Sequence, residues 1–197
     1  MLADSLFAML LGGSLAAAFG VKETHRVMHL NSRVCIVRDW RPSDRASLIR
    51  FANNRNVWRN LTHKFPHPYT ELDADLWFSL LAKMSEPTHW AIEVDTAAVG
   101  GIGVVLGEGI FSKSAELGYW LGEPYWGQGI MTAAVRVVSE HAMSRYGLHR
   151  LEAPVFEWNP VSMNVLEKSG FVREGVLRRR IYKDGKVIDA VMYARVQ

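Results

Sequence analysis

Apolar residues recur at every third or fourth position in several stretches of the chain, and this spacing predicts amphipathic helices. The longest stretch begins near residue 130, where Met131, Val135 and Val138 would lie on one buried stripe. Gly147 follows this stretch, as expected of a C-cap after the last turn of a helix. The pattern predicts helices at about residues 43–52, 70–81, 130–146 and 159–169, and a short one that begins at residue 57.

Residues that cap helices support these boundaries. Ser43 and Thr70 are good N-cap residues, and Asp73 is placed to complete an acidic form of the capping box with Thr70. Asn159 is an N-cap residue followed directly by proline, which favours the first position of a helix. We therefore expect three of the helices to begin directly after Ser43, Thr70 and Asn159.

Runs rich in apolar and β-branched residues lie between the predicted helices and predict strands. Asp184-Gly185 separates the last two runs and is typical of a β-hairpin turn. The runs lie at about residues 34–37, 90–94, 99–106, 115–121, 151–156, 171–182 and 187–196. Because helices and strands alternate without repeats or low-complexity linkers, we expect one α/β domain at residues 33–197.

Residues 1–32 differ from the rest and are interpreted as an N-terminal apolar extension. The apolar run at residues 6–19 is too short to cross a bilayer as a helix, so no membrane association is expected. It resembles the apolar part of a secretory signal, but no Lys or Arg precedes it and Asp4 lies where positive charge is usual. Alternatives are a helix that packs on the domain or on the second subunit of a homodimer, and a misassigned start codon. We expect a cytoplasmic protein.

Composition excludes some classes of protein. With 197 residues, of which 49% are hydrophobic and 22% charged, the chain can bury a core and is not wholly disordered. The net charge of +3 arises from scattered Lys and Arg, with one basic triplet at Arg178-Arg179-Arg180, so nucleic acid is not expected as a partner. The single cysteine, Cys35, excludes an internal disulfide and is expected in the core.

Two pairs of histidines have the spacing of metal ligands on a helix. They are His25 with His29, and His63 with His67. Neither pair has an evident third ligand, and Pro66 interrupts the second pair, so no metal site is expected.

The most informative segment runs from the strand at 115–121 through a glycine-containing turn into the helix at 130–146. The first N–H groups of a helix have no partners within it, and the helix dipole favours negative charge there. Gly127 and Gly129 have no Cβ atom, so a phosphate could approach the backbone closely. The segment therefore predicts a phosphate-bearing ligand at residues 127–132. It lacks the third glycine of a dinucleotide-binding turn and the Gly-Lys-Ser/Thr of a P-loop.

Two motifs in this segment, Gly118-Tyr119-Trp120-Leu121 and Trp126-Gly127-Gln128-Gly129-Ile130-Met131, resemble the acyl-CoA-binding motif of the GNAT superfamily of N-acetyltransferases. The closer resemblance is to its branch of Rim-type acetyltransferases, which act on ribosomal-protein N-termini. Residues 38–44, 159–171 and 189–195 resemble further segments of that branch and occur in the same order. The resemblance implies a GNAT-type α/β fold, with a mixed, mostly antiparallel, twisted sheet flanked by helices.

The resemblance also implies acetyl-CoA as co-substrate and a primary amine as acceptor, either a protein N-terminus or a small molecule such as a polyamine, an amino acid or an antibiotic. Residues 120–122 would pair with the pantetheine arm. Trp126 stands where the family usually has Gln or Arg, which leaves a second interpretation open, a non-catalytic acyl-CoA-binding module. The residues implied to bind the cofactor are Trp120, Leu121, Gly122, Trp126, Gly127, Gln128, Gly129, Ile130, Met131, Thr132, Asn159 and Asn164.

Two residues are candidates for the chemistry of acetyl transfer. Glu116 lies on the strand before the glycine turn and is the candidate base for the incoming amine, although it could instead pair with Lys113. Ser162 lies in the first turn of the shorter C-terminal helix, and the resemblance implies that it approaches the sulfur. It could also be an ordinary first-turn residue. His67 and Tyr69, in a proline-rich loop, are candidates for the acceptor pocket.

Overall fold

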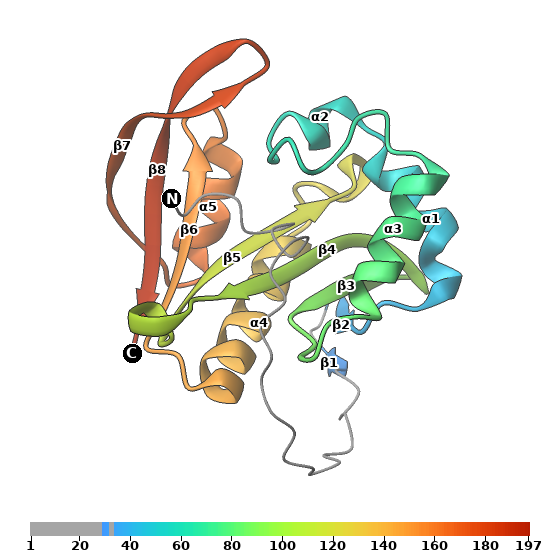
Figure 1. Cartoon of the computed structure of the whole chain (residues 1–197), viewed down its shortest axis with the longest axis horizontal. Helices are drawn as coiled ribbons and strands as arrows, with labels where there is room; N and C mark the ends of the chain where they lie inside the picture. Colours follow the sequence, from blue (N-terminus) through green and yellow to red (C-terminus); the bar gives the residue numbers. More distant parts are fainter. Residues whose placement is uncertain (1–28, 32–33) are drawn as a thin grey trace.

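The computed structural model describes residues 29–31 and 34–197. In this part of the chain, eight strands form one twisted sheet, and helices cover both of its faces (Figure 1). The strands are β1 (His29–Asn31), β2 (Ile36–Arg38), β3 (His89–Val94), β4 (Ala97–Leu106), β5 (Ser114–Leu121), β6 (Arg150–Phe156), β7 (Val172–Lys183) and β8 (Lys186–Val196). The helices are α1 (Arg45–Ala52), α2 (Arg55–Trp58), α3 (Glu71–Leu81), α4 (Ile130–Tyr146) and α5 (Pro160–Lys168), with short 3-10 helices at Pro42–Asp44, Gly109–Phe111 and Glu123–Tyr125.

The strand order in the sheet is β1-β2-β3-β4-β5-β6-β8-β7. Every neighbouring pair is antiparallel except β5 and β6, which are parallel, and this confirms the predicted mixed, mostly antiparallel sheet. β5 and β6 pair over only three positions, of which the last joins Glu116 to Glu152. Beyond Glu116 the two strands separate, so residues 117–121 have β4 on one side and, among the described strands, no partner on the other.

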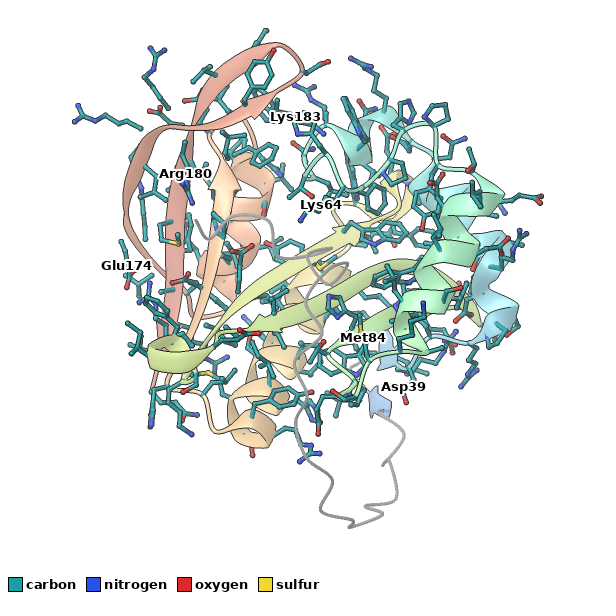
Figure 2. The ribbon with its side chains drawn as sticks, viewed as in Figure 1. Asp39, Lys64, Met84, Glu174, Arg180 and Lys183 are labelled. Carbon is teal, nitrogen blue, oxygen red and sulfur yellow. The ribbon has the colours of Figure 1, made fainter. Side chains whose placement is uncertain are left out.

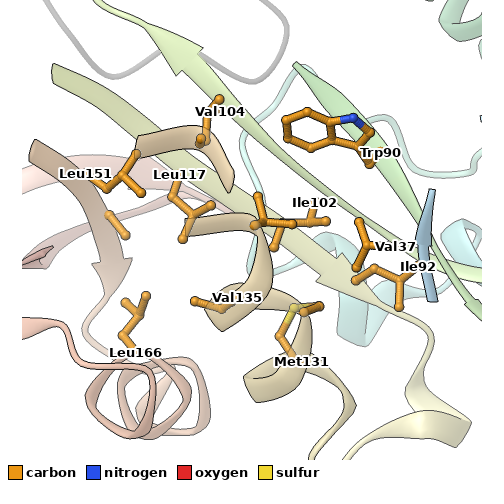
Figure 3. Packing of buried hydrophobic residues seen from close by; sticks show 14 of the residues in the cluster. Val37, Trp90, Ile92, Ile102, Val104, Leu117, Met131, Val135, Leu151 and Leu166 are labelled. Carbon is orange, nitrogen blue, oxygen red and sulfur yellow. The ribbon is translucent and has the colours of Figure 1, made fainter. Parts of the chain in front are cut away.

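The main hydrophobic core lies between the sheet and helices α4 and α5 (Figure 3). Met131 and Val135 of α4 are buried in it, which confirms the predicted stripe. A second cluster, formed by α1, α3 and the loop between them, covers the opposite face of the sheet and includes Leu48 and Tyr69. Because side chains alternate along a strand, β5 directs Leu117 into the main core, whereas Trp120 packs against the second cluster.

Several predicted helix boundaries are confirmed by the contacts at the helix ends. Thr70 and Asp73 form the capping box, in which the Thr70 N–H donates to Asp73 Oδ2 at 2.7 Å. Asn159 Oδ1 accepts the N–H of Ser162 at 3.2 Å. Gly147 ends α4 with the left-handed backbone expected of a C-cap glycine, at φ +58°.

The start of α1 differs from the prediction that Ser43 caps it. Residues Pro42–Asp44 form a 3-10 helix, and α1 begins at Arg45. The reason is a buried ion pair, in which both terminal nitrogens of Arg38 donate to the carboxylate of Asp44, at 2.7 and 2.8 Å. Asp44 Oδ2 also accepts the N–H of Arg41. The carboxylate therefore fixes the backbone at this point, and the Ser43 hydroxyl has no capping role.

The N-terminal part of the described chain includes one strand that was not predicted. β1 pairs with β2 in an antiparallel register, although it lies within the segment interpreted as an extension. The apolar run at residues 6–19 and the His25 side chain lie outside the described residues, so the division at residue 32 stays a prediction. Among the residues that are described, no helix is both long and apolar enough to cross a membrane. Cys35 is buried in the main core, as predicted.

Candidate active site

A cavity of about 930 Å³ lies where β5 and β6 separate. One wall, called here the turn wall, is formed by residues 120–121 and 125–132 together with α5 and its N-cap, from Asn159 to Lys168. The opposite wall, called the hairpin wall, is formed by residues 56–65 of α2 and its following loop and by residues 177–183 of β7. Glu116 also lines the cavity and is the one acidic residue among the described residues that do so.

Glu116 occupies the position where the sheet opens. It is the last residue of β5 that pairs with β6, and its strand neighbours Ala115 and Leu117 point into the main core. Strand alternation therefore directs the Glu116 carboxylate to the other face, the one it shares with Trp120. Lys113, which was weighed as its ion-pair partner, has its Nζ atom beside Gly147 at the end of α4. The geometry thus brings one carboxylate to the cavity at the mouth of the splayed strands.

The turn between β5 and α4 has the backbone expected of a phosphate site. Gly127 and Gly129 have φ angles of +74° and +76°, and no atom lies within 4 Å of a Cβ atom built at either position. The first hydrogen bond within α4 runs from the Ala133 N–H to the Gly129 carbonyl, at 3.0 Å. The N–H groups of residues 130–132 therefore have no partner within the helix. This open cradle fits a phosphate group well.

Side chains in the turn brace it rather than point at a ligand. The Trp126 indole N–H donates to the Leu121 carbonyl at 2.7 Å, and the Gln128 amide donates to the Pro124 carbonyl at 2.9 Å. Glu123 accepts hydrogen bonds from Asn54, the N-cap residue of α2, and from Asn56 within that helix, and these bonds lower the pKa of its carboxyl group. Ile130 and Met131 have their side chains in the core, so only their backbone can meet a ligand.

Ser162 is held against a tyrosine that the sequence analysis assigned no role. The hydroxyl groups of Ser162 and Tyr119 lie 2.8 Å apart, and the Tyr119 hydroxyl also donates to the Ser162 carbonyl at 3.3 Å. Both residues line the cavity. Burial raises the pKa of Tyr119, so this phenol remains protonated near neutral pH. The hydroxyl pair can therefore donate a proton beside the part of β5 that no longer pairs with β6.

The profile of the acetyltransferase (GNAT) domain family matches residues 35–172. The chain belongs to the GNAT family. It is 45% identical to the probable N-acetyltransferase YjcK of Bacillus subtilis over 73 residues, which are 37% of this chain and 40% of that protein. It is 34% identical to the ribosomal-protein-serine acetyltransferase of Escherichia coli over 85 residues, 43% of this chain and 48% of that protein. Among solved structures, Mycobacterium smegmatis RimJ in complex with CoA-disulfide is 30% identical, with a TM-score of 0.73 over 86% of each chain.

These matches confirm the predicted family and its Rim-type branch. They also support the predicted class of protein, an acetyl-CoA-dependent N-acetyltransferase, because the matched family is one of acetyltransferases and the Mycobacterium smegmatis protein holds a CoA disulfide. The activity of this chain is taken up below as a proposal. The chain spans less than half the length of the two curated relatives that it matches here. The acceptor of this GNAT protein is therefore treated below as a proposal.

Most of the residues implied to bind the cofactor gather around the cavity of this GNAT domain. Gly122 does not line it, because its N–H donates to the Val99 carbonyl at 2.8 Å and its carbonyl accepts the Tyr125 N–H at 3.0 Å. We therefore drop Gly122 from the proposed contacts. The residues that do line the cavity are Trp120, Leu121, Trp126, Gly127, Gln128, Gly129, Ile130, Met131, Thr132, Asn159 and Asn164.

Of the two candidates for the acceptor pocket, Tyr69 lines the cavity and His67 does not. Tyr69 is buried in the second cluster. The His67 ring packs on Trp58 with the ring centres 5.8 Å apart. Within residues 29–31 and 34–197, no three His, Cys, Asp or Glu side chains come together in a way that could hold a metal ion.

The structure adds functional candidates that the sequence analysis missed. Tyr119 belongs to a quoted motif, but nothing in its spacing indicated a role in the chemistry. Arg59, Lys64, Arg180 and Lys183 line the hairpin wall, and Figure 2 shows Lys64 and Lys183 on the two segments that form it. The basic triplet at residues 178–180 was the one available signal for Arg180.

Proposed function

We propose that this GNAT protein transfers the acetyl group of acetyl-CoA to the primary amine of a protein N-terminus or of a small molecule. One observation carries the proposal. The turn between β5 and α4, the side of β5 that no described strand pairs with, and the Glu116 carboxylate all border the same cavity. A module that only bound acyl-CoA would need the turn and the strand. It would have no need of a carboxylate at the point where the acyl group ends.

The turn wall supplies the contacts proposed for acetyl-CoA. The N–H groups of residues 130–132 and the open backbone at Gly127 and Gly129 would hold the pyrophosphate. The pantetheine arm would lie along residues 118–121, in the place that a paired strand would otherwise occupy. Asn159 and Asn164 border this path from α5.

Glu116 is proposed to accept the proton of the incoming ammonium group, directly or through a water molecule. The freed amine nitrogen attacks the thioester carbon, so that a C–N bond forms while the C–S bond breaks. Backbone N–H groups of the splayed β5 would stabilise the charge that develops on the carbonyl oxygen. Tyr119 and Ser162 together would donate a proton to the sulfur of CoA, which leaves as the thiol. The second proton that the nitrogen loses as the amide forms would restore the proton of this hydroxyl pair.

A thiol-release assay with a panel of amines tests the proposal. We expect free CoA to appear in step with acetylated amine, as measured by mass spectrometry, for at least one class of acceptor. The competing interpretation, a non-catalytic acyl-CoA-binding module, predicts calorimetric binding of acetyl-CoA without thiol release for any member of the panel. That result would contradict the proposed function.

A further inference from the structure

Lys183, the last residue of β7, is buried in the hairpin wall although it carries a charge. Its Nζ atom lies 3.5 Å from the centre of the Trp58 ring of α2 and has no hydrogen-bond partner among the described residues. Burial lowers its pKa to about 8. Burying an ammonium group without a hydrogen-bond acceptor costs free energy, and a cation–π contact returns only part of it. Packing alone therefore does not explain a lysine at this position.

A β-bulge brings a second cation to the same wall. The β7–β8 register passes from the pair Leu177 and Ala190 to the pair Ile181 and Ile188, so residues 178–180 lie opposite a single residue of β8. That residue is Asp189, and its carboxylate accepts the N–H of Arg179 at 2.7 Å, where φ is +53°. Bulges of this kind redirect side chains. Here Arg180, the residue after the strained position, lines the cavity.

The rest of the hairpin wall carries the same sign of charge. Arg59 and Lys64 also line it, on the loop that faces the hairpin (Figure 2). The acidic neighbour of Lys183 is Asp184, and its carboxylate forms an ion pair with Arg55 at 3.0 Å. Cations therefore predominate on this wall, and Glu116 borders the same cavity from β5.

On the basis of the proposed function, we propose that the acceptor amine carries a negatively charged group of its own, a carboxylate or a phosphate, which binds Lys183 and Arg180. The amine of such an acceptor would face Glu116 while its anion pairs with the hairpin wall. A polyamine would meet like charges on that wall and be disfavoured. The pyrophosphate of CoA is proposed to bind the backbone of the turn wall, which leaves these cations available to the acceptor.

A set of matched acceptors tests the inference. It consists of peptide amides with one common N-terminal residue followed by acidic, neutral or basic residues, together with phosphoethanolamine and spermidine. We expect kcat/KM for an anionic acceptor to exceed that of the neutral peptide by about tenfold or more, with spermidine lowest and the advantage shrinking as salt is added. A preference for the acidic peptide would identify a protein N-terminus as the source of the anion, and a preference for phosphoethanolamine a small molecule.

Substitution of Lys183 tests whether this residue causes the preference for anionic acceptors. Lys183→Met keeps the aliphatic stem against Trp58 and removes the charge, so KM for the anionic acceptor should rise about tenfold. KM for acetyl-CoA and kcat/KM for the neutral peptide should change much less than KM for the anionic acceptor. Lys186→Met is the matched control, because Lys186 faces Lys183 across the hairpin but is exposed and does not line the cavity. Arg180→Gln, at an exposed position, gives a second variant that should fold normally and act in the same direction.

The outcomes separate this inference from the proposed function. Equal kcat/KM for the three peptides with no advantage for phosphoethanolamine, or a preference for spermidine, overturns the inference and leaves acetyl transfer standing. Weaker binding of acetyl-CoA by Lys183→Met also overturns it, because the ammonium group would then serve the cofactor. If no amine is acetylated, the proposed function fails. Calorimetry with the acidic peptide then decides the inference, since Lys183→Met should weaken that binding and Lys186→Met should not.

Discussion

The two walls of the cavity recognise their ligands with different parts of the polypeptide. The turn wall offers backbone N–H groups at the start of α4 and glycines without Cβ atoms, whereas its side chains are occupied in bracing the loop. The hairpin wall offers charged side chains, with Lys183 and Arg180 placed by a strand end and a bulge. A site made of backbone groups keeps its ligand affinity through most side-chain substitutions, whereas a site made of side chains changes its ligand preference when one of them is substituted. A fold built this way can keep its acyl donor while its acceptor changes.

Glu116 lies between the two walls, and its loss should have the largest effect. Glu116→Gln preserves the shape and removes the base, so turnover at neutral pH should fall by roughly a hundredfold or more. The defect should shrink as pH rises, because a larger fraction of the amine is then already deprotonated. Steady-state kinetics across pH, with acetyl-CoA affinity measured by calorimetry, check both statements.

Glu152→Gln is the matched control for this variant. Glu152 lies opposite Glu116 in the β5–β6 register, but it accepts a hydrogen bond from Arg150 and does not line the cavity. Its variant should turn over at the native rate. A native rate in Glu116→Gln itself would mean that the base lies elsewhere, and weakened binding of acetyl-CoA would mean that the two walls are not independent.

The backbone character of the turn wall is tested by Gly129→Val. A branched side chain at a φ of +76° is strained, and its methyl groups would fill the space proposed for the pyrophosphate. We expect CoA affinity to fall more than about tenfold, measured by calorimetry. Gly170→Val controls for the strain, because Gly170 has a φ of +86°, equally open surroundings and no place in the cavity. Comparable loss of CoA affinity in both variants would point to destabilisation instead of a phosphate site.

A smaller effect is expected at the hydroxyl pair formed by Tyr119 and Ser162. Tyr119→Phe and Ser162→Ala should each lower kcat about fivefold to tenfold, since a thiolate leaves fairly well without a proton donor. If the hydroxyls act as one unit, the double variant should be no slower than the slower single variant. Multiplying effects would show two separate roles. Tyr146→Phe, which removes a hydroxyl bonded to the Pro87 carbonyl outside the cavity, should leave kcat unchanged.

The smallest effect on the cavity is expected from deleting residues 1–28. The deletion retains β1, and both walls are built from residues 56 onward. CoA affinity should therefore stay at its native value, while solubility or the mass measured by light scattering changes if these residues join two subunits. Loss of CoA binding would show that the extension belongs to the domain. An unchanged mass and solubility would argue against a homodimer formed through it.

The turn wall could be predicted from the sequence because each of its parts is local. Thr70 with Asp73, Asn159 with Pro160, and the glycines around α4 determine their own backbone within a few residues. The start of α1 could not be predicted from local residues, because the Asp44 carboxylate is held by hydrogen bonds from Arg38 of β2.

The hairpin wall could not be predicted in the same way. Lys183 stands two residues before Gly185, where a lysine is usually a solvated hairpin residue, and its burial depends on Trp58 of a distant helix. Tyr119 was named within a motif without a role of its own, and its contact with Ser162 depends on how α5 docks beside β5. Such contacts follow from the tertiary fold, and no spacing within the chain encodes them.

The indole of Trp126 has a thermodynamic consequence. Its hydrogen bond to Leu121, together with that of Gln128 to Pro124, holds the turn in its functional shape within the free protein. Binding of a phosphate therefore orders little additional backbone in the turn, and little conformational entropy is lost. Trp126 thus replaces a direct contact from a Gln or Arg side chain to the phosphate with a hydrogen bond that preorganises the turn. The affinity for the phosphate at this turn therefore depends on the rigidity of the backbone.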